Sequence, residues 1–331
     1  MLVRLSSGKQ FVANTDEPLL DAAQRGSLTL PYSCKTGRCS TCKGRVVRGS
    51  TTPLHEELGL TAAERDAGWI LTCVRAASSE AVELEIDDLG NFVIHPARTL
   101  ACRIQSLQPM APDVMRVVLR FPPTAELKFH PGQYIDVIGP NGVRRSYSVA
   151  NAPTADKLVE LHIRHVPGGA MSAYWFAQAQ VNDLLRINGP LGTFVLRDVA
   201  DRDVIFLATG TGIAPVKAML ESLTASVSKE AAPRSVTVYW GGRLRQDLYC
   251  DVPAPGVPFR FVPVLSRDPQ SGFAHGHVQD IALSERPDLT STTIFACGSD
   301  AMIHSARTAF LAAGLDTHRF HSDAFVCSAA A

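Results

Sequence analysis

Four cysteines constrain the N-terminal part of this 331-residue chain. Cys34, Cys39 and Cys42 stand in the stretch PYSCKTGRCSTCKG with C-x4-C-x2-C spacing, and Cys73 follows after 30 intervening residues. Four thiolates at this spacing hold a [2Fe–2S] cluster. A structural zinc site or buried reduced cysteines are the alternatives, although zinc sites favour two C-x2-C pairs. The spacing therefore predicts an electron carrier.

The residues between these cysteines suit a loop that is wound closely around sulfur. Gly37, Ser40, Thr41 and Gly44 are small, so the backbone can approach the cluster and leave its amides free. N–H groups that point at cluster sulfur tune such a centre. We expect the amides of this loop to face the thiols.

Charge and hydropathy limit the classes of partner. Lys plus Arg and Asp plus Glu number 32 each, which gives no bias toward nucleic acid or an anionic membrane. The start MLVRLSSGKQF lacks a signal-peptide pattern, and no stretch of about eighteen apolar residues is present. We expect a monomeric cytoplasmic protein without nucleic-acid or membrane partners. In a reducing compartment the remaining cysteines are expected to be free thiols; these are Cys102, Cys250, Cys297 and Cys327.

The length favours several domains, and the pattern changes twice along the chain. We place domains at residues 1–92, 98–199 and 200–331, with a linker around Asn91–Thr99. The first is expected to be β-rich. Its predicted elements are strands at Leu2–Leu5, Gln10–Ala13, Gly44–Arg48 and Val82–Ile86, a helix at Pro18–Gly26 and a capping box at Thr61–Glu64.

The second and third domains differ in the length and burial of their strands. Short strands between Pro and Gly turns predict an antiparallel barrel with one helix; the strands are Val114–Phe121, Gln133–Ile138, Arg145–Val149 and Leu158–His165, and the helix is Met171–Ala179. Continuous apolar runs that alternate with helices predict a doubly wound parallel sheet. Its strands are Val204–Ala208, Val236–Trp240, Phe259–Val264 and Thr293–Ala296, and its helices are Ala214–Ala225 and Asp300–Ala313.

Two segments of the predicted barrel suit a phosphorylated aromatic ligand. Strand alternation sends Arg145 and Tyr147 to one face and Ser146 and Ser148 to the other. An arginine can pair with phosphate, a tyrosine offers a flat surface, and Ser148 can bond a ring nitrogen. Gly168-Gly169-Ala-Met-Ser172 joins a glycine turn to a helix start, which suits phosphate. Alone, the first segment is more often an ordinary strand with a core tyrosine, and the second is equally compatible with a loop that needs two glycines.

Two segments of the predicted parallel sheet suit a dinucleotide. Thr209-Gly-Thr-Gly-Ile-Ala-Pro215 joins a buried strand to a helix, and Gly210 and Gly212 allow a pyrophosphate to approach. The pattern is G-x-G-x-x-P instead of G-x-G-x-x-G. Cys297-Gly298 ends another buried strand at the same sheet edge, where a thiol can lie against a nicotinamide; a buried structural cysteine is the alternative.

In combination these motifs resemble one family along the whole chain. Residues 1–90 resemble a plant-type ferredoxin, and residues 100–331 resemble the ferredoxin–NADP reductase family. The motifs RSYS, TGTGIAP, YWGG and ACGS occur at Arg145, Thr209, Tyr239 and Ala296 in that family's order. The resemblance implies a multidomain α+β and α/β fold. It would contain a β-grasp [2Fe–2S] domain, an antiparallel FAD barrel and a doubly wound nicotinamide domain.

The resemblance also implies roles for single residues. Cys34, Cys39, Cys42 and Cys73 would hold the [2Fe–2S] cluster, and FAD and NADH would be the other cofactors. Tyr147 and Ser148 would contact the flavin ring. Arg145, Gly169 and Ser172 would hold FAD phosphates. Gly210 and Gly212 would take the nicotinamide dinucleotide, with Cys297 beside the nicotinamide. Asp323 and Phe325 match the family's terminal acid and aromatic, with Phe325 over the flavin, although six residues follow here.

The implied function is electron transfer from NADH through FAD to the cluster and on to a separate enzyme. RRSYSVANAP and HSDAFV are most similar to reductases of 3,6-dideoxysugar synthesis, whose acceptor is a dehydratase. The alternatives are a reductase component of an aromatic-ring or other multicomponent oxygenase, and a redox sensor that does not turn over. Arg243 and Arg245 could read the 2′-phosphate of NADPH, but Asp247 would repel it, which favours NADH.

Overall fold

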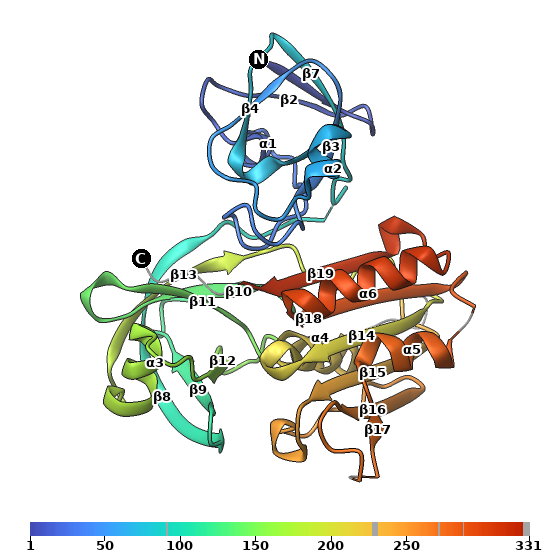
Figure 1. Ribbon diagram of the computed structural model, residues 1–331. Helices are drawn as coiled ribbons and strands as arrows, with labels where there is room; N and C mark the ends of the chain where they lie inside the picture. The colour runs from blue at the N-terminus through green and yellow to red at the C-terminus, as the bar shows by residue number, and fades with distance from the viewer. Residues whose placement is uncertain (91, 227–230, 271, 287, 327–331) are drawn as a thin grey trace. The chain divides into compact units, whose positions relative to one another are not determined.

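The computed structural model describes residues 1–90, 92–226, 231–270, 272–286 and 288–326 (Figure 1). The chain divides into two units. The first contains residues 1–94 with 192–194, and the second contains residues 95–191 with 195–331. Asn91, in the predicted linker, and Cys327, a predicted free thiol, lie outside the described residues.

The first unit is built on a mixed five-stranded sheet. Its strands run in the order β2 (Gln10–Val12), β1 (Leu2–Leu5), β7 (Ala81–Glu85), β3 (Lys43–Arg48) and β5 (Trp69–Leu71). β1 and β7 are parallel, and the other neighbours are antiparallel. Strand alternation buries Val3 and Leu5, and helix α1 (Leu19–Arg25) adds Leu19 and Leu20 to the same core.

Smaller elements hold the cysteines against this sheet. β4 (Thr51–Pro53) pairs with β6 (Arg75–Ala77), and a 3₁₀ turn, η1 (Thr72–Val74), carries Cys73. The predicted capping box is confirmed at the start of α2 (Ala62–Asp66): Thr61 Oγ1 accepts the Glu64 N–H at 3.2 Å, and the Glu64 carboxylate accepts the Thr61 N–H at 2.8 Å.

The second unit begins with a six-stranded antiparallel sheet that closes into a barrel. The strands are β11 (Arg144–Ser148), β10 (Tyr134–Ile138), β13 (Leu184–Leu191), β8 (Arg98–Ala111), β9 (Val114–Arg120) and β12 (Val159–Arg164), in spatial order. An isolated antiparallel bridge connects the two outer strands: it joins Val149, directly after β11, to Leu161 of β12. Closure removes the free edges of the sheet and confirms the predicted barrel.

Two barrel strands and part of a helix differ from the expectation. β8 is not among the predicted strands and begins inside the predicted linker. β13 was not expected either, because Asn188-Gly-Pro190 breaks its strand pattern, yet it lies between β10 and β8. The predicted helix at 171–179 is present, but only α3 (Ala170–Ala173) is α-helical, and Tyr174–Gln178 forms a π-helix.

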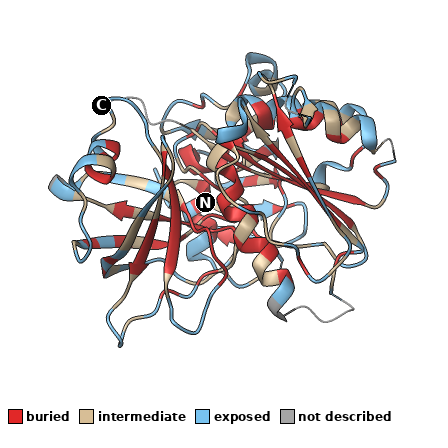
Figure 2. Ribbon diagram, turned by 90° about the horizontal axis from the view of Figure 1, so that it is seen from below, coloured by how far each residue is buried: buried red, intermediate tan, exposed pale blue. Residues whose placement is uncertain are grey.

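The second unit ends in a six-stranded parallel sheet. Its strands run in the order β17 (Ala274–His275), β16 (Phe259–Leu265), β15 (Ser235–Gly242), β14 (Asp203–Thr209), β18 (Thr292–Ser299) and β19 (Phe320–Phe325). Its helices are α4 (Ile213–Ser226), α5 (Val278–Glu285) and α6 (Asp300–Ala312). This confirms the doubly wound sheet. Buried residues follow the strands of both sheets of this unit (Figure 2).

The strand order defines where ligands bind. The chain proceeds from β14 outward through β15, β16 and β17, then returns to the other side of β14 with β18 and β19. The switch point therefore lies between β14 and β18, and open α/β sheets bind ligands at the carboxyl ends of such strands. Thr209 ends β14 and Ser299 ends β18, so the two predicted dinucleotide segments meet at this point.

No helix in the described part of the chain combines the length and the apolar character needed to cross a membrane.

Candidate cofactor sites

The cysteine loop of the first unit directs backbone amides at sulfur. The Cys34 N–H points at Cys39 Sγ at 3.4 Å, and the Thr36 N–H points at Cys34 Sγ at 3.3 Å. Lys35, Gly37 and Ser40 have φ of 56°, 72° and 58°, which places them in the left-handed region. This curls the loop tightly, as the small residues of the motif predict.

The four predicted cluster ligands lie together as two pairs. A hydrogen bond with Cys39 lowers the pKa of the Cys34 thiol to about 5. A hydrogen bond with Cys42 lowers the pKa of Cys73 in the same way. The pKa values of Cys39 and Cys42 are raised, first by these same bonds and then by burial. One thiol of each pair therefore ionises readily, as a metal ligand must.

The pairing of the thiols suits a two-iron cluster. Two pairs of thiols match a cluster that takes four thiolates on two irons. The loop is also closely packed: a Cβ on Gly37 would lie 2.5 Å from the Glu56 carbonyl oxygen, so only glycine fits.

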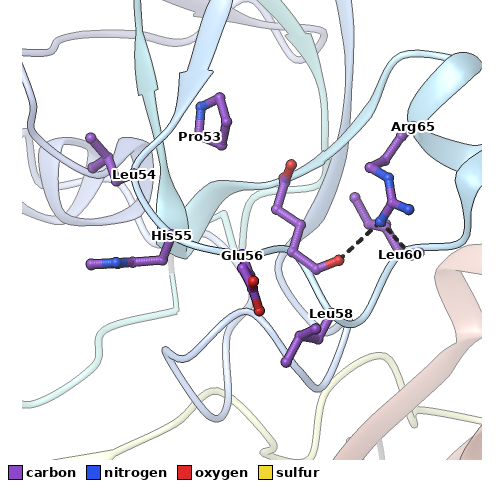
Figure 3. A pocket seen from close by; sticks show the side chains of 8 residues that line it. Pro53, Leu54, His55, Glu56, Leu58, Leu60 and Arg65 are labelled. Carbon is purple, nitrogen blue, oxygen red and sulfur yellow. Dashed lines mark hydrogen bonds between the residues drawn. The ribbon is translucent and has the colours of Figure 1, made fainter.

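A second segment of the first unit braces the cysteine loop. The Gly59 N–H donates to the Gly37 carbonyl at 2.9 Å, and Ser40 Oγ donates to the Gly59 carbonyl at 2.5 Å. Eight residues between Pro53 and Arg65 border an open depression of about 650 Å³ (Figure 3). Arg65 shapes its wall by donating to the carbonyls of Glu57 and Leu60.

Strand β11 separates two sets of side chains as predicted. Arg144 and Ser146 face Asp136 of β10, with Arg144 Nη1 at 3.6 Å and Ser146 Oγ at 2.6 Å from its carboxylate. Arg145 and Tyr147 therefore share the opposite face. The Arg145 guanidinium has no ion pair among the contacts of the described residues. A cation on this face beside an aromatic ring suits a phosphorylated ring system.

Tyr147 is held from behind by a residue that sequence reasoning missed. Trp175, fully buried in the π-helix, donates its indole N–H to Tyr147 Oη at 3.0 Å, with the rings edge to face. Burial raises the pKa of Tyr147 to about 12, so the phenol stays neutral. A buried tryptophan needs a partner for its N–H, but only the tertiary structure shows that this partner is Tyr147. Ser148 is buried at the end of the strand, opposite Tyr134.

The predicted helix start at Gly169 is short, and its serine is engaged. α3 has four residues, with Gly169 at its N-cap. Ser172 Oγ accepts the Val166 N–H at 2.9 Å, which closes the loop before the helix. Ser172 therefore orders the glycine turn.

The glycines of the nucleotide loop allow close packing at the switch point. A Cβ on Gly212 would lie 2.2 Å from the Cys297 carbonyl oxygen, and one on Gly298 would lie 2.3 Å from Thr209 Oγ1. The Ser299 N–H donates to Thr209 Oγ1 at 3.0 Å. The ends of β14 and β18 thus touch through their backbones, which keeps the loop close to Cys297.

Gly210 is surrounded by two large side chains. A Cβ here would lie 2.6 Å from Arg164 Nη1, and Gly210 has φ of 54°. Trp240 donates its indole N–H to the Gly210 carbonyl at 3.0 Å. Neither Arg164 nor Trp240 was predicted as part of this site. The YWGG motif contains Trp240, but its partner cannot be read from the sequence.

Cys297 and Asp323 lie side by side on neighbouring strands. They are register partners of β18 and β19, and Phe325 of the same strand is opposite Ser299. Burial raises the pKa of the Cys297 thiol, and the Asp323 carboxylate adds to this effect. The Cys297 thiol is fully buried, and a protonated thiol is a weak nucleophile, so this cysteine is not suited to covalent chemistry.

The two arginines that follow β15 have partners. Asp247 is buried, and its carboxylate accepts the N–H groups of Arg243 and Leu244 at 2.7 and 3.1 Å. The Arg243 Nε lies 3.4 Å from the same carboxylate, and the Arg245 guanidinium lies over the Phe273 ring. Asp247 therefore orders this turn.

Comparison with known proteins assigns a domain to each of these regions. Family models match as a 2Fe-2S iron-sulfur cluster binding domain over residues 3–78, an oxidoreductase FAD-binding domain over 101–196 and an oxidoreductase NAD-binding domain over 206–308.

Relatives align along almost the whole chain. It is 38% identical over 329 residues to the CDP-6-deoxy-L-threo-D-glycero-4-hexulose-3-dehydrase reductase of Yersinia pestis, with 97% of each chain covered. It is 32% identical to the aromatic O-demethylase reductase subunit of Amycolatopsis, with 96% of each covered. The structure resembles the Amycolatopsis cytochrome P450 reductase with a TM-score of 0.74 and 30% identity over 98% of both chains.

The pairing of Cys73 with Cys42 predicts that Cys73 is a cluster ligand. Cys73→Ser should abolish the visible absorbance of the cluster and leave FAD bound, because a serine cannot supply the thiolate and the flavin barrel belongs to the other unit. Absorption spectra with iron and FAD analysis would measure this. The control is Cys102→Ser, a buried thiol of the barrel, which should keep the cluster. Retained cluster absorbance in Cys73→Ser would show that the ligand set is wrong.

The two faces of β11 predict different roles for Arg145 and Arg144 in FAD binding. Arg145→Ala should weaken FAD binding by roughly 1.5–3 kcal/mol, because a charge-assisted phosphate contact is lost. Its neighbour Arg144 faces Asp136 on the opposite side, so Arg144→Ala should bind FAD normally. Titration of the FAD-free protein, followed by flavin fluorescence, would compare them. Equal weakening in both variants would contradict the assignment, as would release of FMN on heating.

Proposed function

The chain belongs to the family of NAD(P)H-dependent flavin reductases that carry an N-terminal [2Fe–2S] domain, and we propose that its electron acceptor is a sugar dehydratase. Membership makes it an oxidoreductase with FAD, nicotinamide and [2Fe–2S] domains that delivers electrons to a separate enzyme. The observation that carries the proposal is the higher identity, 38%, to a reductase named for a CDP-6-deoxy-hexulose dehydrase. Relatives with oxygenase or demethylase names share 29–32% identity.

The proposed roles follow the geometry of each site. Bound flavin accepts a hydride from the nicotinamide and can pass electrons on singly to an iron–sulfur cluster. Arg145 neutralises a phosphate of FAD, and Tyr147 supports the ring in an orientation that Trp175 sets. Ser148 bonds the ring at the strand end. Gly169 and Ser172 shape the turn that receives the remaining phosphate.

The nicotinamide is proposed to lie at the switch point of the parallel sheet. The loop at Gly210–Gly212 receives the dinucleotide, and Cys297 presents a neutral thiol to the ring. Burial keeps that thiol protonated by raising its pKa, and the neighbouring Asp323 carboxylate adds to the effect, because a second negative charge beside it is unfavourable. Phe325, at the end of β19, covers the flavin edge. The four cysteine thiolates hold the cluster that passes electrons to the acceptor.

We also propose a monomer in the cytoplasm without nucleic-acid partners. The equal numbers of acidic and basic residues support the last point. In the described part of the chain no cysteine forms a disulfide, which suits a reducing compartment.

Turnover with protein acceptors tests this function. The purified protein should reduce ferricyanide or cytochrome c steadily with NADH, and it should support a CDP-hexulose dehydrase in sugar deoxygenation. Oxygenase components supplied in its place should receive electrons poorly. Efficient coupling to an oxygenase alone would favour the alternative partner. Binding of all cofactors without turnover would instead indicate a redox sensor.

Nucleotide preference follows from the turn after β15. Because Arg243 is paired with Asp247 and Arg245 is stacked on Phe273, neither arginine is poised for a 2′-phosphate. We predict a higher kcat/KM for NADH than for NADPH. A tenfold preference for NADPH, equivalent to about 1.4 kcal/mol, would contradict this. In that event Arg243→Gln should abolish the preference, while Arg260→Gln, at an exposed ion pair with Glu285, should not.

A further inference from the structure

Strand β12 carries three polar side chains on the face that points away from the barrel core. Leu161 and Ile163 point inward and are almost fully buried. Glu160, His162 and Arg164 alternate with them and therefore share the outer face. Each contacts a different part of the parallel-sheet region, at Lys217, Tyr249 and Asp247 respectively. A single barrel strand thus contacts that region at three points.

The first contact is a clasp built by helix α4, directly after the nucleotide loop. Lys217 Nζ lies 3.2 Å from Glu160 and 2.7 Å from Glu221, and it donates to the Ala150 carbonyl at 3.0 Å. Glu221 in turn accepts the Ala152 N–H at 2.9 Å. Ala150 and Ala152 follow immediately after the flavin strand β11. One turn of α4 therefore holds the chain that leaves the flavin strand.

The second contact leads to the nucleotide loop itself. His162 lies 2.9 Å from Glu160 through Nε2 and 3.1 Å from Tyr249 Oη through Nδ1. Tyr249 packs edge to face on Trp240, with ring centroids 5.2 Å apart. Trp240 donates to the Gly210 carbonyl. The position of Gly210 thus depends on an unbroken series of contacts that begins at β12.

The third contact supports the same loop from the end of β12. Arg164 pairs with Asp113 at 3.0 Å and lies 3.8 Å from Asp247, which orders the turn after β15. Its Nη1 occupies the space beside Gly210. Replacing this arginine would therefore open a gap beneath the loop.

The protonation states of Glu160 and His162 fix the direction of the hydrogen bonds that link β12 to Tyr249. Burial raises the pKa of Glu160, but hydrogen bonds from His162 and Arg116 and the charge of Lys217 outweigh it, so its pKa lies far below the ordinary value. Burial lowers the pKa of His162 despite the opposing effect of Glu160. A neutral His162 donates a hydrogen bond from Nε2 to the Glu160 carboxylate and accepts a hydrogen bond from the Tyr249 hydroxyl at Nδ1.

A partly buried ionic network is a costly way to join two surfaces. Apolar side chains of the same size often stabilise such a contact equally well, whereas polar partners accept only one geometry. The network therefore fits a requirement for fixed alignment better than a requirement for stability. Hydride transfer is such a requirement, because displacement of about 1 Å can lower its rate by roughly two orders of magnitude.

We propose that the outer face of β12 (Glu160, His162 and Arg164), acting with Lys217 and Glu221, sets the nucleotide loop in its working position against the flavin strand. This inference rests on the proposed function. Lys217 and Glu221 are positioning residues in this scheme, because their observed partners are the backbone after β11 and the Glu160 carboxylate. These residues would contribute alignment alone, and the hydride transfer would be supplied by the two cofactors when they are bound.

Lys217→Met and Glu221→Gln test the proposal with the whole, cofactor-loaded protein. The first retains the length of the side chain, and the second retains its shape. Mass-spectrometric hydrogen exchange of the oxidised protein without nucleotide should show faster exchange at Ala152 in both variants. Stopped-flow reduction by NADH should show a limiting rate of flavin reduction lowered roughly 10- to 100-fold, with FAD content and the dissociation constant for NADH unchanged. The isotope effect with NADH deuterated at C4 should increase.

Arg260→Met is the matched control, because it breaks an exposed ion pair between β16 and α5 in the same region. It should leave the exchange at Ala152 and the limiting rate at wild-type values. Faster exchange at Ala152 with a wild-type rate and isotope effect would mean that the clasp is only structural, and would overturn the proposal. Failure of NADH to reduce the flavin of the wild-type protein would overturn the proposed function, and this inference with it.

Discussion

The contact between two backbones at the switch point is the constraint on which the nucleotide site depends. Gly212 lies against the Cys297 carbonyl, and Gly298 lies against Thr209, at distances that no side chain would tolerate. The two neighbouring parallel strands can therefore end at the same place, with the loop, the thiol and the carboxylate of Asp323 around one point. The glycines of the G-x-G-x-x-P pattern thus have two effects. They allow the strand ends to pack closely, and they leave room for a pyrophosphate beside the backbone.

Polar contacts between the barrel and the parallel sheet complete this arrangement. Partial burial makes the charges of the β12 network costly unless they are paired, and Glu160 and Arg164 both have partners across the junction. Lys217 and Glu221 hold the chain after the flavin strand, and Trp240 holds the nucleotide loop. Two regions that bind different cofactors are consequently held in register by directional bonds, which an apolar contact would not specify.

In the cysteine loop, small residues and left-handed backbone conformations concentrate the thiols. Amides point at sulfur, and each pair contains one thiol with a lowered pKa. This is local chemistry that the motif encodes directly. The bracing segment around Gly59 is different, because it joins the loop only when the first unit is folded.

Sequence alone determined the features that depend on short-range pattern. The cysteine spacing, the capping box at Thr61, the alternation at Arg145–Ser148 and the apolar runs of the parallel sheet were all readable, because local geometry requires them. Tertiary structure alone decided the partners: Tyr147 with Trp175, Gly210 with Arg164 and Trp240, Lys217 with Glu160. It also decided β8, β13, β17 and β19, which the sequence pattern did not indicate as strands. Contacts between residues that are distant along the chain depend on how whole elements pack, and no local pattern specifies that.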